Sequence, residues 1–567
     1  MVSPTSPDRP VMLVVEDDAT ARERIVEQLE RRYSADYDVV SERSIAGGLQ
    51  ALRRLRDAGV AVAVVLSNQA GSDRDGDEFF DAVRMLHPDA KRVLLIEWGA
   101  WADPVTADAI HRLMAIGAID YYGLKPWRPH DEYFHRTITD FLNEWERSVS
   151  RDKREVTVVG PQWSSRSHEI RSLLVRNGVP HAFHDSNSPI GHELLDRYNL
   201  TAADAPVVLS YDDRVLVKPT NAQIAEAYGV STRLDDSSGS EFDLIVVGAG
   251  PAGLAAAVYA SSEGLRTLVV ERESIGGQAG SSSLIRNYLG FPRGVSGAEL
   301  AQRAYQQAWV FGTRFLLMRE VVELHQEDGW HVLRTADEAQ VRGRAVVLAA
   351  GVSYRRVGAE ALEALEGAGV YYGASVSEAR ALAGADVFVV GGGNSAGQAA
   401  LHLARYARTV TILVRGSTLA DSMSRYLIDQ IDAAGIRVWF HTEVVDGGGD
   451  PRLEWISLRD RNTGEVRREP AAALFILIGA VPHTDWLPAG IQKDEWGYLI
   501  TGADISRDRW PLDRRPQVLE TNIPGVFAVG DVRGRSVKRV ASAVGEGSVV
   551  IQQVHEVLAA ASSDAVS

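Results

Sequence analysis

The first residues that could do chemistry are the glycines of Gly248-x-Gly250-x-x-Gly253, which follow an apolar stretch at 242–247. The first glycine allows a tight turn, the second lets backbone approach a pyrophosphate, and the third lets helix and strand pack closely. The start of the following helix adds partial positive charge toward the phosphates. Glu271 ends the next strand, 23 positions after Gly248, where a carboxylate can accept from ribose hydroxyls. The pattern predicts a bound dinucleotide with a free ribose.

A second glycine turn, Gly391-x-Gly393-x-x-Ala396, lies in "VFVVGGGNSAGQAA". The position equivalent to Glu271 is Val414, and Arg415 follows it. An acid there would repel a ribose 2′-phosphate, whereas arginine pairs with one, so this copy is predicted to bind NADP(H). A surface arginine at a strand end is the alternative interpretation. The predicted NADPH-binding residues are Gly391, Gly393, Asn394, Ser395, Ala396, Arg415 and, as a second phosphate ligand, Arg425.

Polar residues also follow apolar strands near the N-terminus. Glu16 and Asp17 end "VMLVVED", Asn68 ends "VAVVLSN", and Lys125 follows "IDYYGL". Strands and helices alternate through 9–147, which predicts a parallel, doubly wound α/β sheet. Strand ends meet at the carboxyl edge of such a sheet, where ligands bind. A solvated strand end without a ligand is the other interpretation of these acids, and we predict no metal site in the chain.

The elements that must position these residues belong to several domains, because 567 residues exceed one hydrophobic core. Polar stretches at 147–155 and 231–241 have the composition of linkers. They divide the chain into segments 9–147, 153–232 and 241–567. All three segments read as α/β.

Composition excludes some classes of function. The net charge of −16 argues against broad nucleic-acid binding, which needs a basic surface. There is no apolar run near the ~20 residues of a membrane span and no signal-peptide pattern, so a cytoplasmic protein without a membrane partner is expected. The cysteine count of zero excludes any thiol relay, disulfide or cysteine zinc site in this chain.

Residues 241–567 resemble the low-molecular-weight thioredoxin reductase family over their whole length. The shared motifs are "GAGPAG", "ERESIGGQA", "NYLGFP", "AAG", "GGGNSA", "AVGD" and "KRVASAVGEGS". The resemblance implies Rossmann-like FAD and NADPH domains, a homodimer, and a nucleotide domain that rotates to bring NADPH to the flavin. The FAD domain would comprise 241–352 and 483–567, with the NADPH domain, 353–482, inserted. By this resemblance FAD would contact Gly248, Gly250, Pro251, Ala252, Gly253, Glu271, Arg272, Gly277, Gln278, Asn287, Val321, Ala350, Gly351, Gly530, Asp531, Val540 and Ala541.

The chain departs from that family at the redox motif. The family reads Cys-Ala-Thr-Cys where this chain has Gly373 and Val376 at the cysteine positions, and the acid that follows is Ser377. Every thiol step is thereby removed, while hydride transfer from NADPH to flavin needs orientation rather than a protein nucleophile. We expect no catalytic side chain at these positions and an open pocket beside the flavin.

The first two segments resemble other families. Residues 9–147 are similar to response-regulator receiver domains, with Glu16, Asp17 and Lys125 in the receiver pocket but Asn68 in place of the phosphoacceptor aspartate. An amide cannot take an aspartyl phosphate, so a docking or dimerising pseudo-receiver is expected. Residues 153–232 resemble the thioredoxin/glutaredoxin fold, with "WSSRS" at the redox motif and Pro206 at the cis-proline. A spacer or interaction role is expected for it.

Two classes of function remain open from the sequence. The first is an enzyme, an NADPH-dependent FAD oxidoreductase that passes electrons to a quinone, O₂, a small disulfide or a redox protein. Ferredoxin–NADP reductases of thioredoxin-reductase architecture also lack the cysteine pair, so electron transfer to a protein partner is one form of this hypothesis. The second class is a redox- or nucleotide-responsive regulator with little turnover, which could engage a partner through the receiver-like segment. Thioredoxin-disulfide reductase activity is predicted to be absent.

Overall fold

The computed structural model describes residues 9–68, 75–115, 118–149, 156–177, 179–210, 214–227, 239–282, 284–373, 379 and 381–564. The chain forms two compact units. One comprises Met1–Lys153 with Arg425–Gly435, and the other comprises Arg154–Ser424 with Ile436–Ser567. In the described part of the chain, every helix is too short or too polar to cross a lipid bilayer.

The first unit is built on a five-stranded parallel sheet in the order β2-β1-β3-β4-β5. Alternate residues of β1 face opposite ways: Leu13 packs under α2, α3 and α4, and Met12 packs under α1 and α5. Apolar helices therefore cover both faces, as the alternation of strands and helices predicts. The elements are β1 (Val11–Val15), α1 (Ala19–Tyr33), β2 (Asp38–Glu42), α2 (Ile45–Asp57), β3 (Val62–Ser67), α3 (Asp75–Leu86), β4 (Lys91–Ile96), η1 (Ala100–Ala102), α4 (Pro104–Ala115), β5 (Tyr121–Leu124) and α5 (Glu132–Val149).

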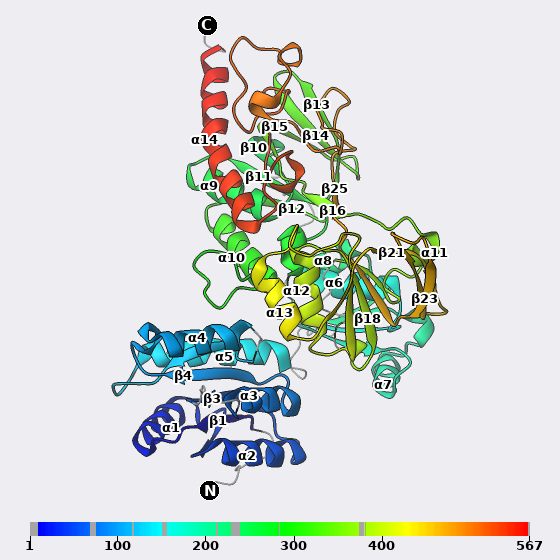
Figure 1. The fold of residues 1–567 in the computed structure, drawn as a ribbon. Helices are drawn as coiled ribbons and strands as arrows, with labels where there is room; N and C mark the ends of the chain where they lie inside the picture. Colours follow the sequence, from blue (N-terminus) through cyan, green and yellow to red (C-terminus); the bar gives the residue numbers. More distant parts are fainter. Residues whose placement is uncertain are drawn as a thin grey trace. The chain divides into compact units, whose positions relative to one another are not determined.

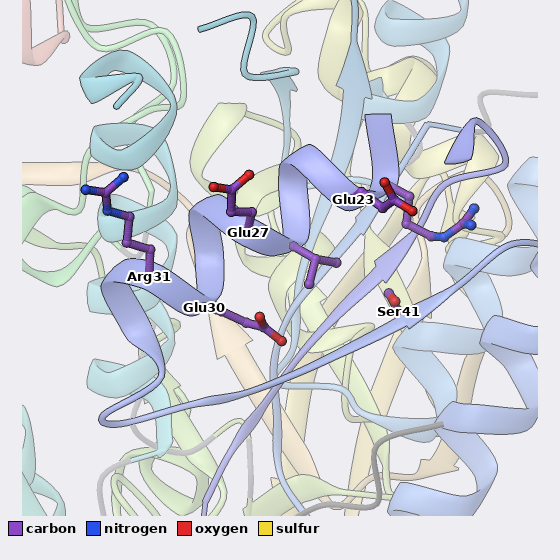
Figure 2. Close-up of a pocket in the computed structure, with 7 residues that line it drawn as sticks. Glu23, Glu27, Glu30, Arg31 and Ser41 are labelled. Carbon is purple, nitrogen blue, oxygen red and sulfur yellow. The ribbon is translucent and has the colours of Figure 1, made fainter. Parts of the chain in front are cut away.

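An open groove of about 680 Å³ runs along the exposed side of α1 (Figure 2). Two arginines and three glutamates line it, which is the pattern of a solvated helix face. None of the predicted site residues lines it. The lining residues are Arg22, Glu23, Val26, Glu27, Glu30, Arg31 and Ser41.

The second unit begins with a small α/β module at residues 156–227, which we call the thioredoxin-like module after the fold expected from its sequence. Its sheet has the order β7-β6-β8-β9, with β6 parallel to β7 and the other pairs antiparallel. The Ala205–Pro206 peptide bond is cis. The elements are β6 (Val156–Gly160), α6 (Ser165–Arg176), β7 (His181–Asp185), α7 (Pro189–Arg197), η2 (Ala202–Asp204), β8 (Val207–Ser210), β9 (Val215–Val217) and α8 (Asn221–Ala227).

The first glycine turn lies in a seven-stranded sheet in the order β12-β11-β10-β15-β14-β13, with β26 paired to β15. Ala252 and Ala255 of α9 lie against Gly547 of α14, so the two helices pack closely, and they lie side by side in Figure 1. The elements are β10 (Glu241–Val247), α9 (Pro251–Ser262), β11 (Thr267–Glu271), η4 (Gly277–Ser281), α10 (Gly297–Val310), β12 (Arg314–Leu317), β13 (Val321–Glu327), β14 (Trp330–Thr335), β15 (Gln340–Leu348), η6 (Gly502–Asp504), η7 (Arg507–Arg509), β26 (Val526–Ala528), η8 (Gly530–Val532) and α14 (Val540–Asp564).

The second glycine turn lies in a separate parallel sheet, β17-β24-β18-β19-β20, beside a three-stranded antiparallel sheet, β21-β22-β23. A two-stranded ribbon, β16 with β25, joins this region to the first. The ribbon carries positions 353 and 482, at which the inserted domain is predicted to begin and end. The elements are β16 (Val352–Tyr354), α11 (Glu360–Glu363), β17 (Val370–Tyr372), β18 (Asp386–Val390), α12 (Asn394–Leu403), β19 (Thr409–Leu413), β20 (Arg437–Trp439), β21 (Thr442–Gly448), β22 (Trp455–Asp460), β23 (Val466–Pro470), β24 (Ala473–Ile476) and β25 (Ala480–Pro482). Between β19 and β20 the chain forms α13 (Arg425–Ala433), which belongs to the first unit.

Candidate functional site

The three glycines of the first turn have different physical roles. Gly248 has φ +107°, and a Cβ built there would lie 2.3 Å from the carbonyl oxygen of Ala349. A Cβ on Gly253 would lie 1.9 Å from the carbonyl oxygen of Gly248. Gly250 is extended, caps α9, and has open space within 4 Å of its Cβ position. The first and third glycines thus close the turn, and the second leaves room for a pyrophosphate at the helix start.

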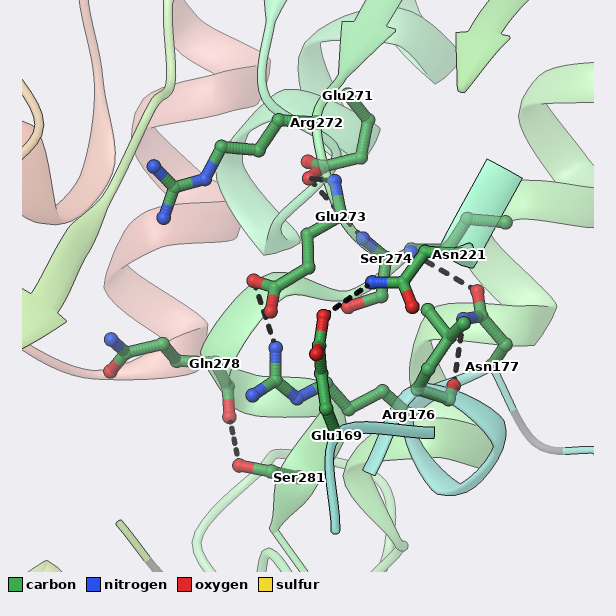
Figure 3. Close-up of polar contacts among 12 residues, drawn as sticks. Glu169, Arg176, Asn177, Asn221, Glu271, Arg272, Glu273, Ser274, Gln278 and Ser281 are labelled. Atoms are coloured by element: carbon green, nitrogen blue, oxygen red, sulfur yellow. Dashed lines mark hydrogen bonds and ion pairs between the residues drawn. The ribbon is translucent and has the colours of Figure 1, made fainter. Parts of the chain in front are cut away.

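Glu271 fastens the end of β11 to this turn (Figure 3). One carboxylate oxygen accepts from the backbone N–H of Ala249 at 2.7 Å, and the other accepts from the N–H groups of Glu273 at 2.8 Å and Ser274 at 3.3 Å. Burial raises the pKa of the Glu271 carboxyl group, while these three hydrogen bonds oppose that shift. Since a carboxylate has about four acceptor sites, Glu271 can also accept from a ribose hydroxyl. Its structural role in the turn was not predicted from the sequence.

Three further segments pack against the first glycine turn and the start of α9. A Cβ on Gly530 would lie 2.9 Å from the Ala252 Cβ, and a Cβ on Gly547 of α14 would lie 2.1 Å from the Ala252 carbonyl oxygen. The turn also abuts the backbone of Ala349 and Ala350. The structure therefore brings Gly248–Gly253, Ala350–Gly351, Gly530–Asp531 and the first turns of α14 together. This arrangement fits a dinucleotide lying along the carboxyl edge of the sheet.

Asp531 and Glu546 form the polar side of that meeting point. Burial raises the pKa of the half-buried Asp531 carboxyl group, and Lys538 Nζ donates to the Asp531 carbonyl oxygen at 2.6 Å. Glu546 accepts from the Gly530 N–H at 2.7 Å and pairs with Arg533 at 2.6 Å. Against the effect of burial, these partners lower the pKa of Glu546. Glu546 positions the Gly530–Asp531 turn, and only its place in "KRVASAVGEGS" could have indicated it.

The remaining predicted FAD residues are spread over the same region. The η4 turn lies close to Gly250, because a Cβ on Gly277 would be 3.4 Å from the Gly250 Cα. The Gln278 side-chain amide donates to the Val352 carbonyl oxygen, and Arg272 Nη2 lies 3.0 Å from His483 Nε2. The others occupy simpler positions: Asn287 on an exposed bend, Val321 buried at the start of β13, and Val540 and Ala541 at the start of α14.

The second glycine turn has a similar geometry. Gly391 has φ +139°, and a Cβ there would lie 2.4 Å from the Leu477 carbonyl oxygen. Gly393 caps α12, followed by Asn394, the exposed Ser395 and the buried Ala396. Two serines missed in the sequence hold the loop beside the turn: Ser422 Oγ donates to the Gly392 carbonyl oxygen at 2.8 Å, and the Ser424 N–H donates to Asn394 Oδ1 at 2.7 Å. The second glycine turn therefore also fits a nucleotide phosphate at the start of α12.

The two arginines predicted for the 2′-phosphate differ in their surroundings. Arg415 is exposed and follows the buried Val414 at the end of β19, the edge toward which the glycine turn also faces. Its carbonyl oxygen accepts from Arg461 Nη1 at 3.3 Å. Arg425 begins α13, which belongs to the other compact unit, and its guanidinium pairs with Asp429 at 2.9 Å. Arg415 is thus the better placed candidate for discriminating between NADPH and NADH.

The position of the first family cysteine is not open. Gly373 has φ +90°, and a Cβ there would lie 2.5 Å from Cε2 of Tyr354. The expected pocket over Gly373–Ser377 stays a prediction, but at Gly373 itself the Tyr354 ring fills the space that a side chain would need. Burial raises the pKa of the Tyr354 phenol, which also bonds Ser281 of the η4 turn. Val376 and Ser377 lie outside the described residues.

Restoring the two cysteines is expected to fail without a change at Tyr354. Gly373→Cys with Val376→Cys should leave both thiols reduced, because the left-handed backbone strains a cysteine by about 1–3 kcal/mol and the ring blocks its side chain. Adding Tyr354→Ala should raise the yield of disulfide severalfold. Mass spectrometry after mild oxidation measures this cleanly, since the chain has no other cysteine. Equal disulfide yields with and without Tyr354 would contradict the steric explanation.

The acid pocket of the first unit is closed by its own residues. Asn68 Nδ2 donates to Glu16 Oε1 and to Asp17 Oδ1, both at 2.6 Å. Lys125 Nζ lies 3.0 Å from Glu16 Oε2 and 3.1 Å from Glu97 Oε1. Burial raises the pKa of Glu16 against the opposing effect of Lys125, and the Asn68 hydrogen bond lowers the pKa of Asp17. In the described part of the chain, no three acidic or histidine side chains gather as a metal site.

Replacing Asn68 by aspartate should create a cation requirement. Asn68→Asp removes the bridging donors and brings a third carboxylate to Glu16 and Asp17, which should cost about 1.5–3 kcal/mol per lost charge-assisted hydrogen bond. Millimolar Mg²⁺ should recover most of the loss, because oxygen ligands suit this ion. Thermal unfolding in EDTA and in Mg²⁺ measures the effect. Asn68→Ala, which adds no charge, is the control and should not respond to Mg²⁺; a Mg²⁺-independent Asn68→Asp variant would contradict the idea.

The redox-motif positions of the thioredoxin-like module have structural roles. Ser164 Oγ caps α6 by accepting from the Ser167 N–H at 3.5 Å. A Cβ on Gly160 would lie 2.5 Å from Ser167 Oγ and 3.1 Å from the Pro206 Cβ, so these three residues meet. A shallow pocket of about 520 Å³ lies beside Pro206, where Arg166 donates to Asn221 Oδ1 at 2.8 Å and to the Pro219 carbonyl oxygen at 2.6 Å. Arg166, one of the charged residues that line this pocket, is therefore already engaged.

Comparisons with known proteins concern the second unit. A family model described as pyridine nucleotide-disulphide oxidoreductase matches residues 242–547. Over 319 residues, the chain is 33% identical to the thioredoxin reductase of Bacillus subtilis, a match that covers 55% of this chain and 93% of the relative. It is 31% identical over 310 residues to a 34.2 kDa protein in the rubredoxin operon of Clostridium pasteurianum, covering 54% and 94%. The crystal structure of T. acidophilum thioredoxin reductase matches with a TM-score of 0.51 and 27% identity, covering 58% of this chain and all of that one.

Proposed function

The chain belongs to the pyridine nucleotide-disulphide oxidoreductase family, whose thioredoxin reductase members bind FAD and NADPH, and from this premise we propose an NADPH-dependent FAD oxidoreductase that works without dithiol chemistry. Electrons would pass from NADPH to the flavin and then to an acceptor such as a quinone, O₂, a small disulfide or a redox protein. Without the thiol relay of thioredoxin reductases, the proposed reaction is reduction of the flavin by NADPH, followed by direct transfer of electrons from the flavin to the acceptor.

One observation carries the proposal. Two nucleotide turns keep the glycine geometry that phosphates require, while the redox-motif position beside them is Gly373 packed under Tyr354, in a chain without cysteine. A thioredoxin reductase passes its electrons on through a protein thiolate that attacks the disulfide of thioredoxin. This chain has none, so the likeness to thioredoxin reductases does not extend to that step.

Bound FAD would supply the redox chemistry, and the chain's own residues would hold and orient the two nucleotides. Gly250 and the start of α9 would face the FAD pyrophosphate, with Glu271 at its ribose. Gly393 and the start of α12 would face the NADPH pyrophosphate, with Arg415 at the 2′-phosphate. Tyr354, which bonds Ser281 and abuts Gly373, would exclude water between the η4 turn and β17.

The proposal is tested by anaerobic stopped-flow mixing of the FAD-loaded protein with NADPH. The expected result is bleaching of the flavin band near ~450 nm, followed by reoxidation when quinone, ferricyanide, O₂ or a small iron–sulfur protein is added. Oxidised thioredoxin should give no turnover above the O₂ background. Sustained NADPH-driven thioredoxin reduction would overturn the claim that dithiol chemistry is absent.

A regulatory function is the second candidate, and the closed acid pocket favours it. Asn68 holds Glu16 and Asp17 at 2.6 Å, which suits a receiver-like domain kept in one state rather than one switched by phosphorylation. The receiver-like segment would then offer a constant docking surface to a protein partner. This candidate expects bound nucleotide without flavin bleaching, so the same stopped-flow experiment separates the two. A homodimer is expected in either case.

A further inference from the structure

Helix α6 of the thioredoxin-like module ends on the loop that covers the first glycine turn. We call residues 271–281 the flavin loop. Arg176 Nη1 pairs with Glu273 Oε2 at 2.9 Å, and the Ile275 N–H donates to Asn177 Oδ1 at 3.4 Å (Figure 3). A Cβ on Gly280 would lie 3.4 Å from the Arg176 carbonyl oxygen, so backbone packs on backbone here. The C-terminal end of α6 therefore forms part of the wall behind the predicted FAD site.

The other end of the same helix contacts the second nucleotide region. We call residues 366–372, which lead to Gly373, the approach strand. Ser165 Oγ donates to the Glu366 carbonyl oxygen at 2.5 Å, and a Cβ on Gly367 would lie 2.8 Å from the Ser165 Cα. The His168 ring lies 5.2 Å from the Tyr371 ring, centre to centre. The N-terminal end of α6 is thus fitted tightly against the approach strand.

Helix α6 can transmit force between these two contacts. Its 12 residues span about 18 Å, and its inner face is buried in the module core through Ile170, Leu173 and Leu174. Met318, which follows β12 of the FAD-side sheet, packs against that same core. A buried helix held at both ends moves as one body, because packed interiors do not deform continuously.

We propose that α6 is a strut that couples the flavin loop to the approach strand, with Arg176 and Asn177 as positioning residues at one end and Ser165 and His168 at the other. The thioredoxin-like module is then a working part of the nucleotide machinery rather than a spacer. It sets how the two nucleotide regions lie relative to each other, and a change at one site reaches the other through the helix. The inference depends on the two nucleotide sites proposed above, but not on the identity of the electron acceptor.

Hydrogen exchange of the full-length, FAD-loaded chain tests the coupling without any turnover. Arg176→Glu places two acids together at the flavin loop, and it should speed exchange of the approach-strand amides, at the opposite end of α6, at least about fivefold. Ser165→Ala should do the same to the flavin-loop amides. The charge swap Arg176→Glu with Glu273→Arg should restore exchange at both places, because the pair is re-formed in reverse.

Arg197→Glu is the matched control. Arg197 is the last residue of α7 in the same module and pairs with Glu193, which lies on its own helix, so this change should leave both segments unaltered. The coupling is overturned if each α6 variant alters exchange only at its own end. It is also overturned if the charge swap repairs the flavin loop but not the approach strand. If NADPH does not reduce the flavin of the unmodified protein, that result counts against the proposed function and not against the coupling.

A cross-link gives a second measurement, in which a covalent bond takes the place of the Arg176–Glu273 ion pair. A Cβ at Gly280 would lie 3.9 Å from the Arg176 Cβ, within the range that disulfides bridge. Arg176→Cys with Gly280→Cys should form a single disulfide, since the chain has no other cysteine. Oxidation should slow exchange in the approach strand, and dithiothreitol should reverse it. The proposed coupling through α6 would be overturned if the disulfide does not form. It would also be overturned if the disulfide forms and exchange in the approach strand does not change.

Discussion

Replacing Gly250 by valine is expected to abolish FAD binding while leaving the folded chain intact. The Gly250 Cβ position is open and its φ of −71° suits any residue, so the protein itself tolerates the side chain. The valine would occupy the space that a pyrophosphate needs at the start of α9. FAD affinity should fall at least about 100-fold, or about 2.7 kcal/mol. Fluorescence titration of FAD into the apoprotein measures the affinity.

Two other glycines act as controls for this result. Gly490→Val places the same side chain at an exposed turn with open space, and FAD binding should be unchanged. Gly253→Ala should instead destabilise the fold itself, because its Cβ would meet the Gly248 carbonyl oxygen at 1.9 Å. An unfolded Gly250→Val protein, or one that keeps its yellow cofactor, would show that the open space at Gly250 is not the pyrophosphate position.

Replacing Arg415 by alanine is expected to weaken NADPH binding about 10–100-fold, or about 1.4–2.7 kcal/mol, and to leave NADH binding nearly unchanged. The expected partner of the guanidinium is the 2′-phosphate, which NADH lacks. Dissociation constants from flavin reduction at varied NADPH and NADH measure the two effects. Their ratio, rather than either value, reports the role of Arg415.

Arg405→Ala is a suitable control for charge alone, because Arg405 is also exposed and follows α12. It should leave the preference between the two nucleotides unaltered. An equal loss of NADPH and NADH binding in Arg415→Ala would show that this residue supports the loop and does not recognise the phosphate. A loss seen only with Arg425→Ala would assign the 2′-phosphate to that residue instead.

The nucleotide turns could be predicted because their chemistry is local. A residue with φ near +107° and a backbone oxygen 2.3 Å from its Cβ position must be glycine, so Gly248 marks the turn wherever the rest of the chain goes. The strand before it and the acid that ends the next strand then place the turn at the carboxyl edge of a parallel sheet. The same reasoning applies to Gly391. The positive charge of Arg415, the residue after Val414, predicts a ribose that carries a 2′-phosphate.

Other features of the site could not be predicted because they join distant parts of the chain. The Ser165 hydroxyl and the Glu366 carbonyl are 201 positions apart, and the Asn177 side chain meets the Ile275 N–H across 98 positions. The Asn68 amide also faces two acids more than 50 positions away. From the sequence, Asn68 is only a lost phosphoacceptor; in the fold its amide donates to both acids, while the charge that offsets Glu16 comes from Lys125.

The sequence by itself determined which chemistry this protein can perform: two dinucleotide cradles, a cation in place of an acid in the second, and no thiol anywhere. Those properties depend on residue type and short spacing, which survive any arrangement of domains. Only the tertiary structure decided what surrounds that chemistry. The Tyr354 ring packs against Gly373, Glu546 holds the Gly530–Asp531 turn, and α6 contacts both nucleotide regions. These contacts join different elements of the chain, from 13 to 201 positions apart, and only the tertiary fold brings them together.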